Sequence, residues 1–599
     1  MSKKKVGIAF SDFVTEETFK HRVSKSSFVP AEIFAFAPLF FLVLLFSLIF
    51  FRLFYIQIIR GEYYRGLADT NRTRTTIIPA PRGIIYDIKG RTLVSNSPSF
   101  KIIEKDSKGK DKIKRIDKDE ALKLIAQGKK VENDVERNYL FRESFAQSLG
   151  YVGQISDKEV LLPEFSDYSI TDYVGKMGLE KEYEGMLHGK NGKELFEVNS
   201  KGEKVRSLGR EEPQQGESLN TTLNLDLELA ANNAFANHKK GAVVVSDPRD
   251  GSILALYSKP NFDPNIFTHS DAYTPSGTYS SPEGVLLDSD NHPFLNRAIS
   301  GTYPPGSTFK LITAIAGLET GAIKADTQIQ DTGVLKVGAF SFGNWYWLQY
   351  GKTEGSLNVV GAIKRSNDIF FYKTAEGAGV EGVSLWAKNF GLGETYGIDM
   401  PGEAHGTVPD EKWKKDYIHE NWYLGDTYNY GIGQGYLLTT PLQVNMWTSV
   451  FANDGTLYKP HLLKGQTKVL KKNLVKKEYA DLIREGMFES CATGGVAWPL
   501  FDFKVNPPAG GLKIDNQNYT EDASGGAKMV RVKVGCKTGT AQIGGEKDNP
   551  HAWITAFAPF YNPEVVVTVL VENGGEGSSI AGPIARDILK EYFEKKTSN

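Results

Sequence analysis

The longest apolar run of this chain lies near its N-terminus and predicts a membrane helix. Residues 33–51 contain no charged side chain, and a helix over this range spans roughly 28 Å, close to the hydrocarbon thickness of a bilayer. The run is longer than a signal-peptide core, and bulky Phe and Leu stand where a small-residue cleavage site belongs. We therefore predict one permanent transmembrane helix over 33–55 and no second span.

Positive charge precedes the predicted helix. Residues 1–25 carry six Lys and Arg side chains against three acidic ones. Positive charge of this kind favours the cytoplasmic side of a membrane. The pattern predicts a cytoplasmic tail over 1–32 and places everything after residue 60 outside the cytoplasm.

Shorter periodic patterns then predict a first domain outside the membrane, over 56–238. Alternating apolar positions at 75–78 and 84–86 predict strands. The range 101–137 is dense in Lys, Asp and Glu and indicates a solvated face or a projecting lobe. Apolar residues at helical spacing over 225–238 predict a connecting helix.

Strand patterns recur at both ends of the remaining chain, which we assign to a second domain over 239–599. Helical patterns lie between them, so a single sheet that joins both ends of a mixed α/β domain is expected. The pattern predicts early strands at 241–246 and 252–257, late strands at 552–560 and 565–572, and a closing helix at 580–593.

Composition narrows the possible functions only slightly. The net charge of −1 gives no support for nucleic-acid binding. Cys491 and Cys536 are the only cysteines, too few for a disulfide framework or a thiolate metal site. The expected role of Cys536 is that of a small buried hydrophobic residue.

Tyr303–Lys310 (YPPGSTFK) is the first stretch that indicates chemistry. Two prolines and a glycine lead to Ser307, and the apolar run 309–318 behind it predicts a helix. Free N–H groups at a helix start favour negative charge. Lys310 lies one turn further on the same face, where it takes the proton of the Ser307 hydroxyl if its own pKa is lowered. Ser-x-x-Lys also occurs at 2–5 and 107–110, without an apolar helix behind it.

A second element is the only Lys-Thr-Gly triplet of the chain. Lys537, Thr538, Gly539 and Thr540 follow 529–535, which alternates like a strand. Lys537 offers a cation, Thr538 a hydroxyl for a carboxylate, and Gly539 room for a peptide that pairs with the strand.

Two segments compete for the third element. Residues 289–291 spell Ser-Asp-Asn but precede Ser307, whereas Ser366 and Asp368 lie between Ser307 and Lys537. Penicillin-type sites take their elements in the order Ser-x-x-Lys, Ser-x-Asn, Lys-Thr-Gly. We therefore choose Ser366 as a proton relay and Asp368 as a partner of the lysines, and interpret 289–291 as a polar loop. The negative charge of Asp368 opposes a lowered pKa of Lys310.

In these motifs the chain resembles the class B penicillin-binding proteins, and more narrowly the elongation-specific penicillin-binding protein 2 group. The likeness runs from the membrane helix to near the C-terminus. It rests further on Arg82–Asp87 (RGIIYD), Gly178–Glu180 (GLE), Gly431–Gly435 (GIGQG), Thr440–Gln443 (TPLQ) and Phe557–Pro559 (FAP).

The resemblance implies the fold and the reaction. It implies an α/β (α+β) transpeptidase domain with an antiparallel sheet and a helical subdomain, preceded by an elongated pedestal domain and one transmembrane helix. Ser307 would attack the D-Ala–D-Ala carbonyl of a peptidoglycan stem peptide, and an amine of a neighbouring stem would take the acyl group. The oxyanion would lie between the N–H groups of Ser307 and Thr540. β-Lactams would acylate the same serine.

Some members of this group hold zinc with Asp, His and Cys side chains ahead of the Ser-x-Asp motif. This chain has neither His nor Cys between 320 and 366, so we predict no metal and no other cofactor. In their place stands the aromatic segment 340–350, for which core packing is expected over a role in lining the groove.

The resemblance also implies partners and a location. A membrane-embedded SEDS-family (RodA-type) glycosyltransferase and other proteins of the elongation complex are expected, and no nucleic acid. The catalytic domain would lie on the periplasmic side of the inner membrane.

Rival functions are a D,D-carboxypeptidase, a β-lactamase, a β-lactam sensor and a non-catalytic cell-wall scaffold. Residues 354–358 spell the Glu-x-x-Leu-Asn of class A β-lactamases, but here the motif precedes Ser366, whereas in that family it follows the Ser-x-Asn element. Residues 1–32 are short for a sensor's output domain.

Overall fold

The structure is a computed structural model, and it describes residues 32–105, 111–199, 203–508, 511–519, 529–544 and 548–596. The predicted tail over 1–32 falls, except for its last residue, outside this range. The chain divides into two compact units, one of residues up to 76 together with 194–210, the other of 77–193 together with 211–599.

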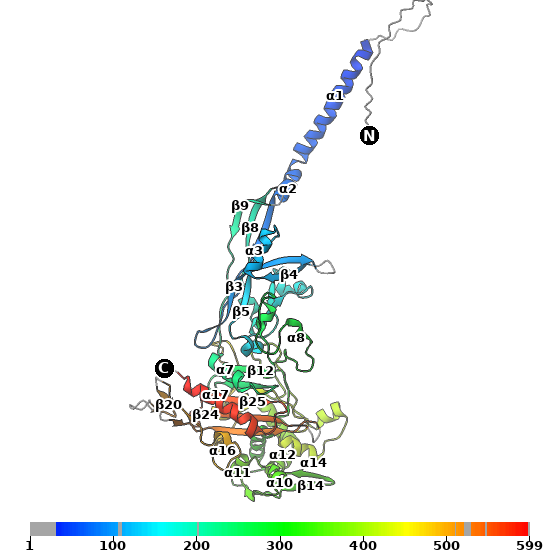
Figure 1. Cartoon of the computed structure of the whole chain (residues 1–599). Coiled ribbons are helices and arrows are strands. Elements are labelled where there is room, and N and C mark those ends of the chain that lie inside the picture. Colours follow the sequence, from blue (N-terminus) through cyan, green and yellow to red (C-terminus); the bar gives the residue numbers. More distant parts are fainter. Residues whose placement is uncertain are drawn as a thin grey trace, which may run out of the picture. The chain divides into compact units, whose positions relative to one another are not determined.

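The first unit contains the predicted membrane helix. Helix α1 spans Glu32–Phe54 and continues through a short π-helix, Tyr55–Ile59, before α2, Gly61–Arg72 (Figure 1). Residues 38–59 are long and apolar enough to cross a bilayer, and none of the window is buried within the protein. Such exposure of Phe and Leu is stable in lipid and not in water. Most of a three-stranded sheet, β1 (Thr73–Ile78), β8 (Gly192–Val198) and β9 (Lys204–Glu211), also lies in this unit.

A second sheet occupies the predicted lobe. Its strands run in the order β10-β2-β3-β4, and β5 also pairs with β3. In the described parts of the charge-dense range, 101–105 and 111–137, the chain forms strands and one helix, and a small apolar cluster lies among them. The bounds are β2 Ile85–Tyr86, β3 Thr92–Lys105, β4 Asp111–Ile116, α3 Lys118–Ala126, β5 Glu132–Tyr139 and β10 Leu219–Asn220.

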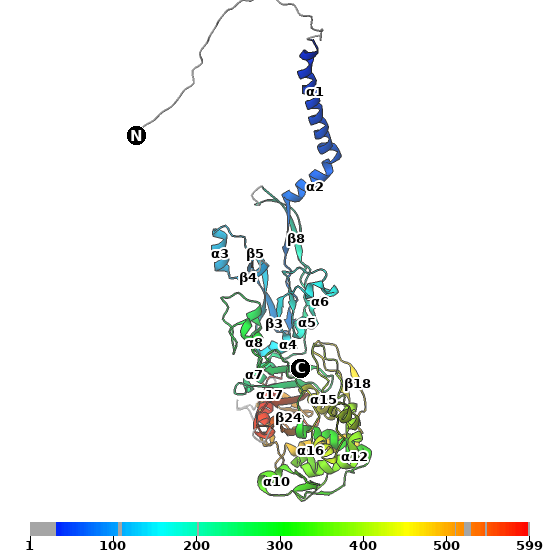
Figure 2. The ribbon, with the colours of Figure 1, turned by 90° about the vertical axis from the view of Figure 1, so that its right-hand side faces the viewer.

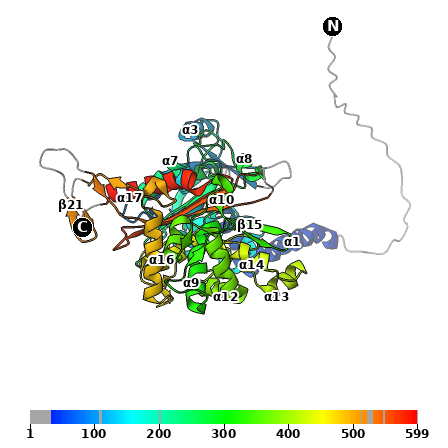
Figure 3. The ribbon, with the colours of Figure 1, turned by 90° about the horizontal axis from the view of Figure 1, so that it is seen from below.

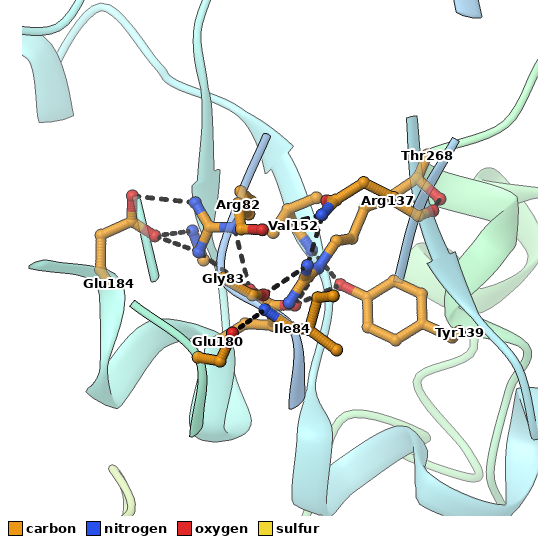
Figure 4. A network of polar contacts seen from close by, with 12 residues as sticks. Arg82, Gly83, Ile84, Arg137, Tyr139, Val152, Glu180, Glu184 and Thr268 are labelled. Carbon is orange, nitrogen blue, oxygen red and sulfur yellow. Dashed lines mark hydrogen bonds and ion pairs between the residues drawn. The ribbon is translucent and has the colours of Figure 1, made fainter. Parts of the chain in front are cut away.

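A buried ion network joins two sequence motifs of this part of the chain. Arg82 donates to Glu180 at 2.8 Å and to Glu184 at 2.8 Å, and Arg137 donates to Glu180 at 2.7 Å (Figure 4). Tyr139 lies at the same carboxylate. The short helices α5 (Gly178–Glu182) and α6 (Glu184–Leu187) carry both acids. The network therefore fastens the 82–87 motif to the 178–180 motif.

The second domain is built on a five-stranded antiparallel sheet in the order β12-β11-β25-β24-β23. Both ends of the domain contribute strands, as the sequence predicts. The bounds are β11 Gly241–Ser246, β12 Ile253–Lys259, β23 Gly535–Ala541, β24 His551–Ala558 and β25 Val565–Val571.

Helices cover both faces of this sheet. The helices α7 (Leu225–Ala234) and α17 (Gly582–Glu594) lie on one side, and α9, α12 and α16 on the other (Figure 3). Figure 2 shows β24 close to both α15 and α17. Alternation places Ile554 in the core with α17 and Trp553 in the core with α15. The helices of the second face are α9 Lys310–Thr320, α11 Val359–Arg365, α12 Asp368–Asn389, α14 Leu424–Gly431, α15 Pro441–Ala452 and α16 Lys477–Ser490.

One predicted strand lies elsewhere. Within the range 529–535, Val530–Arg531 forms a short strand, β22, which pairs with β19 (Lys504–Val505) outside the large sheet. The strand of that sheet begins at Gly535 and contains the Lys-Thr-Gly motif itself. The Lys and Thr side chains of this strand are polar, so an analysis of hydrophobic periodicity does not detect it. The strand is buried because it packs against the helices.

The buried network gives a stability prediction. Glu180→Gln leaves Arg82 and Arg137 without the shared charge, and breaking a buried ion pair in this way costs about 3–5 kcal/mol. We expect a lower thermal unfolding temperature by calorimetry of the detergent-solubilised chain. Glu182→Gln, on the exposed side of the same helix, is the matched control. Equal stability of the two variants would contradict the role assigned to the network.

Candidate active site

Ser307 lies in a tight turn that touches the edge strand of the sheet. It belongs to a 3-10 turn, Gly306–Phe309, that runs directly into α9. Gly306 has φ +54°, and a Cβ there would meet the Thr540 carbonyl at 3.0 Å. A Cβ on Gly539 would meet the Pro305 carbonyl at 3.0 Å. These two glycines allow the serine turn and β23 to lie against each other.

Lys310 is fully buried behind this turn. Its Nζ donates to the Ser366 carbonyl at 2.7 Å and to Asp368 Oδ1 at 2.6 Å, and it lies 3.4 Å from Ser366 Oγ. Burial lowers the pKa of Lys310, and the charge of Asp368 opposes this without cancelling it. The opposition expected from Asp368 is therefore present, but burial is the larger effect.

The hydroxyl of Ser366 joins the two buried lysines. Lys537 Nζ donates to Ser366 Oγ at 2.8 Å and to the Thr538 carbonyl at 2.8 Å. Burial holds the pKa of Lys537 well below its usual range, the positive charge of Lys310 lowers it further, and Asp368 opposes both. Ser366 ends α11 with φ +53°, a backbone conformation that costs a non-glycine residue energy and is typical of functional sites.

Asp368 opens α12 and holds the lysines from one side. Its Oδ2 accepts from the Trp345 N–H at 2.8 Å while Oδ1 binds Lys310. The structure thus brings together Lys310, Ser366, Asp368 and Lys537 as predicted, with Ser307 beside them on the same turn as Lys310. Within the described residues no hydrogen bond joins Ser307 Oγ to Lys310 Nζ. Contacts between a nucleophile and its base are often long in structures without substrate, so this distance does not rule the pair out.

The other predicted residues lie along β23. Thr538 pairs with Ile554, Gly539 with Trp553 and Thr540 with Ala552. Thr540 Oγ accepts from the Gly577 N–H at 3.3 Å. β23 is the last strand in the order of its sheet, and a terminal strand is the kind of place where an extended peptide adds to a sheet.

The rejected motif copy at 289–291 forms a polar turn, as predicted. Asn291 donates to Asp288 and does not approach the lysines. The lactamase-like 354–358 has structural contacts: Glu354 pairs with Arg365 at 2.8 Å, and Asn358 caps α11.

Two expectations were wrong. Cys491 and Cys536 form a disulfide with a Cα–Cα distance of 5.9 Å, so Cys536 is not a free buried thiol. The aromatic segment 340–350 is not core, because Phe340 is 73% exposed and Tyr350 61% exposed. Sequence reasoning also missed Trp345, since a backbone N–H leaves no signal in residue type. In the parts of the chain that the structure describes, no group of three His, Cys, Asp or Glu side chains is arranged to hold a metal ion.

Comparison with known proteins identifies the group to which this constellation belongs. Residues 241–590 match the penicillin-binding protein transpeptidase domain, and 110–221 match the penicillin-binding protein dimerisation domain. The chain belongs to the penicillin-binding proteins.

Relatives place it in the penicillin-binding protein 2 group. The peptidoglycan D,D-transpeptidase MrdA of Haemophilus influenzae is 30% identical over 98% of this chain and 95% of its own length. The Escherichia coli K12 protein of the same name is 31% identical over 92% of each. Penicillin-binding protein 2 of Helicobacter pylori, in a complex with MreC, superposes with a TM-score of 0.71 at 28% identity, over 87% of this chain and 98% of that one. The predicted fold and the predicted class, a peptidoglycan D,D-transpeptidase, are thereby confirmed.

The disulfide of this penicillin-binding protein gives a second prediction. It closes a loop of 45 residues between the end of α16 and the strand that carries Lys537, and a cross-link over such a loop contributes about 4 kcal/mol in the chain-entropy model. We expect Cys491→Ala to lower the unfolding temperature. Non-reduced peptide mapping should find the two cysteines in one linked fragment. Alkylation of both thiols in the unreduced, denatured chain would contradict the bond.

Proposed function

We propose that Ser307 is the nucleophile of this transpeptidase and Lys310 its general base. The observation that carries the proposal is the pair of buried ammonium groups, Lys310 and Lys537, around the single hydroxyl of Ser366. Two cations this close favour loss of a proton from one of them. Of the two, Lys310 is the one that lies one turn behind Ser307, so the neutral form of Lys310 is the amine that accepts the serine proton.

The reaction follows from these positions. Ser307 Oγ bonds to the carbonyl carbon of the D-Ala–D-Ala bond as its proton moves to Lys310 Nζ. The negative charge on the carbonyl oxygen is held by the N–H groups of Ser307 and Thr540, and each such donor contributes about 10²–10³ in rate. The proton passes through Ser366 to the leaving D-Ala amine. The amine of a second stem peptide then bonds to the acyl carbon as it gives a proton to Lys310. The ester bond to Ser307 breaks, and Lys310 returns that proton to Ser307 Oγ.

The remaining residues have binding roles in this scheme. Lys537 holds the Ser366 hydroxyl and adds positive charge near the terminal carboxylate of the stem peptide. Thr538 and Thr540 offer hydroxyls to that carboxylate, and the free edge of β23 pairs with the peptide backbone. A β-lactam would occupy the same place and acylate Ser307. A solved structure of Pseudomonas aeruginosa penicillin-binding protein 2 in complex with WCK 5153 covers 87% of this chain at 28% identity, with a TM-score of 0.64.

We further propose that the catalytic domain lies on the extracytoplasmic side of the membrane. The Cys491–Cys536 disulfide supports this location, because disulfides form and persist in oxidising compartments outside the cytoplasm. The positively charged residues ahead of α1 favour a cytoplasmic N-terminus. The expected partners are an elongation-complex protein and a SEDS-family (RodA-type) glycosyltransferase. In support, one similar structure is a complex with MreC, and another is a peptidoglycan synthase complex that couples polymerization and crosslinking.

Removal of the nucleophile tests the scheme directly. We expect Ser307→Ala to abolish covalent labelling by a fluorescent penicillin while the chain stays folded, and mass spectrometry of the wild-type adduct to place the drug on Ser307. Ser289→Ala, in the rejected motif copy, should label normally.

Lys310→Ala should reduce the acylation rate by about 10²–10⁴. A loss below about tenfold would remove the base role of Lys310.

The pH dependence of acylation tests the charge balance. The rate should rise with pH as Lys310 loses its proton, with a midpoint below that of an ordinary lysine, because burial lowers the pKa of Lys310. In Asp368→Asn the opposing charge is gone, so the pKa of Lys310 falls further and the rising limb moves to lower pH. A limb that moves to higher pH would show that Asp368 does not act on the base.

A further inference from the structure

Asp331 is a buried carboxylate with no role in the scheme above. It lies between β13 (Ile329–Gln330) and β14 (Val334–Val337) and is only 2% exposed. Within the described residues no Lys or Arg pairs with it. Its oxygens accept only from N–H groups, those of Gly333 at 2.8 Å, Glu354 at 2.9 Å and the Asn344 side chain at 2.9 Å. A buried charge held by neutral donors is costly and calls for a reason.

Asn344 connects this carboxylate to the lysine cluster. It is fully buried, its Nδ2 donates to Asp331, and its Oδ1 accepts from the Asp368 N–H at 3.0 Å. A carboxylate can only accept and a backbone N–H can only donate, so the amide of Asn344 has a single satisfied orientation. Asp331 in its charged form therefore fixes which end of that amide faces Asp368.

Trp345 makes a second contact with Asp368. The N–H of Trp345, next in the chain after Asn344, binds Asp368 Oδ2 at 2.8 Å. One turn thus holds both the backbone and one carboxylate oxygen of Asp368, and the other oxygen is left for Lys310 at 2.6 Å. Rotation of this carboxylate away from Lys310 would break the contact of its Oδ2 with the Trp345 N–H, while the contact with Asn344 holds the backbone from which the side chain extends.

We propose that Asp331 is a positioning residue for acylation: through Asn344 it holds Asp368, and Asp368 holds Lys310 in place behind Ser307. The inference rests on the proposed roles of Ser307 and Lys310 and adds a residue that none of the three motifs contains. Asp331 touches neither substrate nor base, so it acts by geometry and not by proton transfer.

The alternative is that Asp331 only stabilises the β14–β15 hairpin (β15, Phe340–Gly343), and the pH profile separates the two. The titratable groups that face Lys310 are Asp368 from α12 and Lys537 from β23, with the Phe371 ring 5.6 Å from its Nζ. If Asp368 loses its orientation, Lys310 loses the one carboxylate that pairs with it among the described residues. The rising limb then moves to lower pH, whereas partial unfolding lowers the amplitude and leaves the midpoint in place.

The test measures acylation of the full-length, detergent-solubilised chain by a fluorescent penicillin across pH. We expect Asp331→Asn to lower the plateau rate about 10- to 100-fold, as a small misplacement of a catalytic group does. The rising limb should move in the same direction as in Asp368→Asn. Asp326→Asn, exposed on the same connection, is the matched control and should behave as wild type.

Asn344→Ala is a second variant that tests the proposal if Asp331→Asn does not fold. It keeps the Asp331 charge and removes the link, so the same limb shift is expected. Thermal unfolding of each variant is measured beside the rates. Unshifted midpoints in both variants overturn the proposal, whether or not the plateau falls. If wild type is not acylated at all, the proposed function fails first, and this inference with it.

Discussion

Two ammonium groups buried around one hydroxyl are the constraint on which this molecule depends. Neither Lys310 nor Lys537 is exposed to water, and in the part of the chain that the structure describes Asp368 is the one carboxylate that pairs with Lys310. An arrangement with two full positive charges and one negative is unfavourable in such a place. Burial therefore lowers the pKa of both amines, and a lowered pKa is the property that a lysine needs to act as a base beside a serine hydroxyl.

The residues of this cluster come from three parts of the fold that are distant in the sequence. Lys310 comes from α9, Ser366 and Asp368 from the junction of α11 and α12, and Lys537 from the edge of the sheet. Contact between these parts depends on missing side chains at Gly306 and Gly539 as much as on the residues that react. The buried network around Arg82 likewise joins distant parts of the chain, since Arg82 and Arg137 both donate to the carboxylate of Glu180.

Motif order selected residues that the structure brings together, Lys310, Ser366, Asp368 and Lys537, and this order is independent of the local pattern of hydrophobicity. Periodicity found the early and late strands, whose faces are uniformly apolar, but it misplaced the strand of the Lys-Thr-Gly motif. The aromatic segment 340–350 misled for a related reason: residue type indicates affinity for a core, yet Phe340 and Tyr350 lie on the surface. The bond between Cys491 and Cys536 and the contact of Trp345 with Asp368 depend on tertiary proximity, to which single-sequence reasoning has no access.

The strand order has a consequence for how the enzyme is made. β23 reaches the early strands only through β24 and β25, and β25 is the strand that pairs with β11. A ribosome must therefore deliver the chain to about residue 571 before Lys537 can be held beside Lys310. Until then the nascent helices carry Ser307 and Lys310 without the strand that carries Lys537. Premature release of the polypeptide yields an inert product rather than an unregulated one.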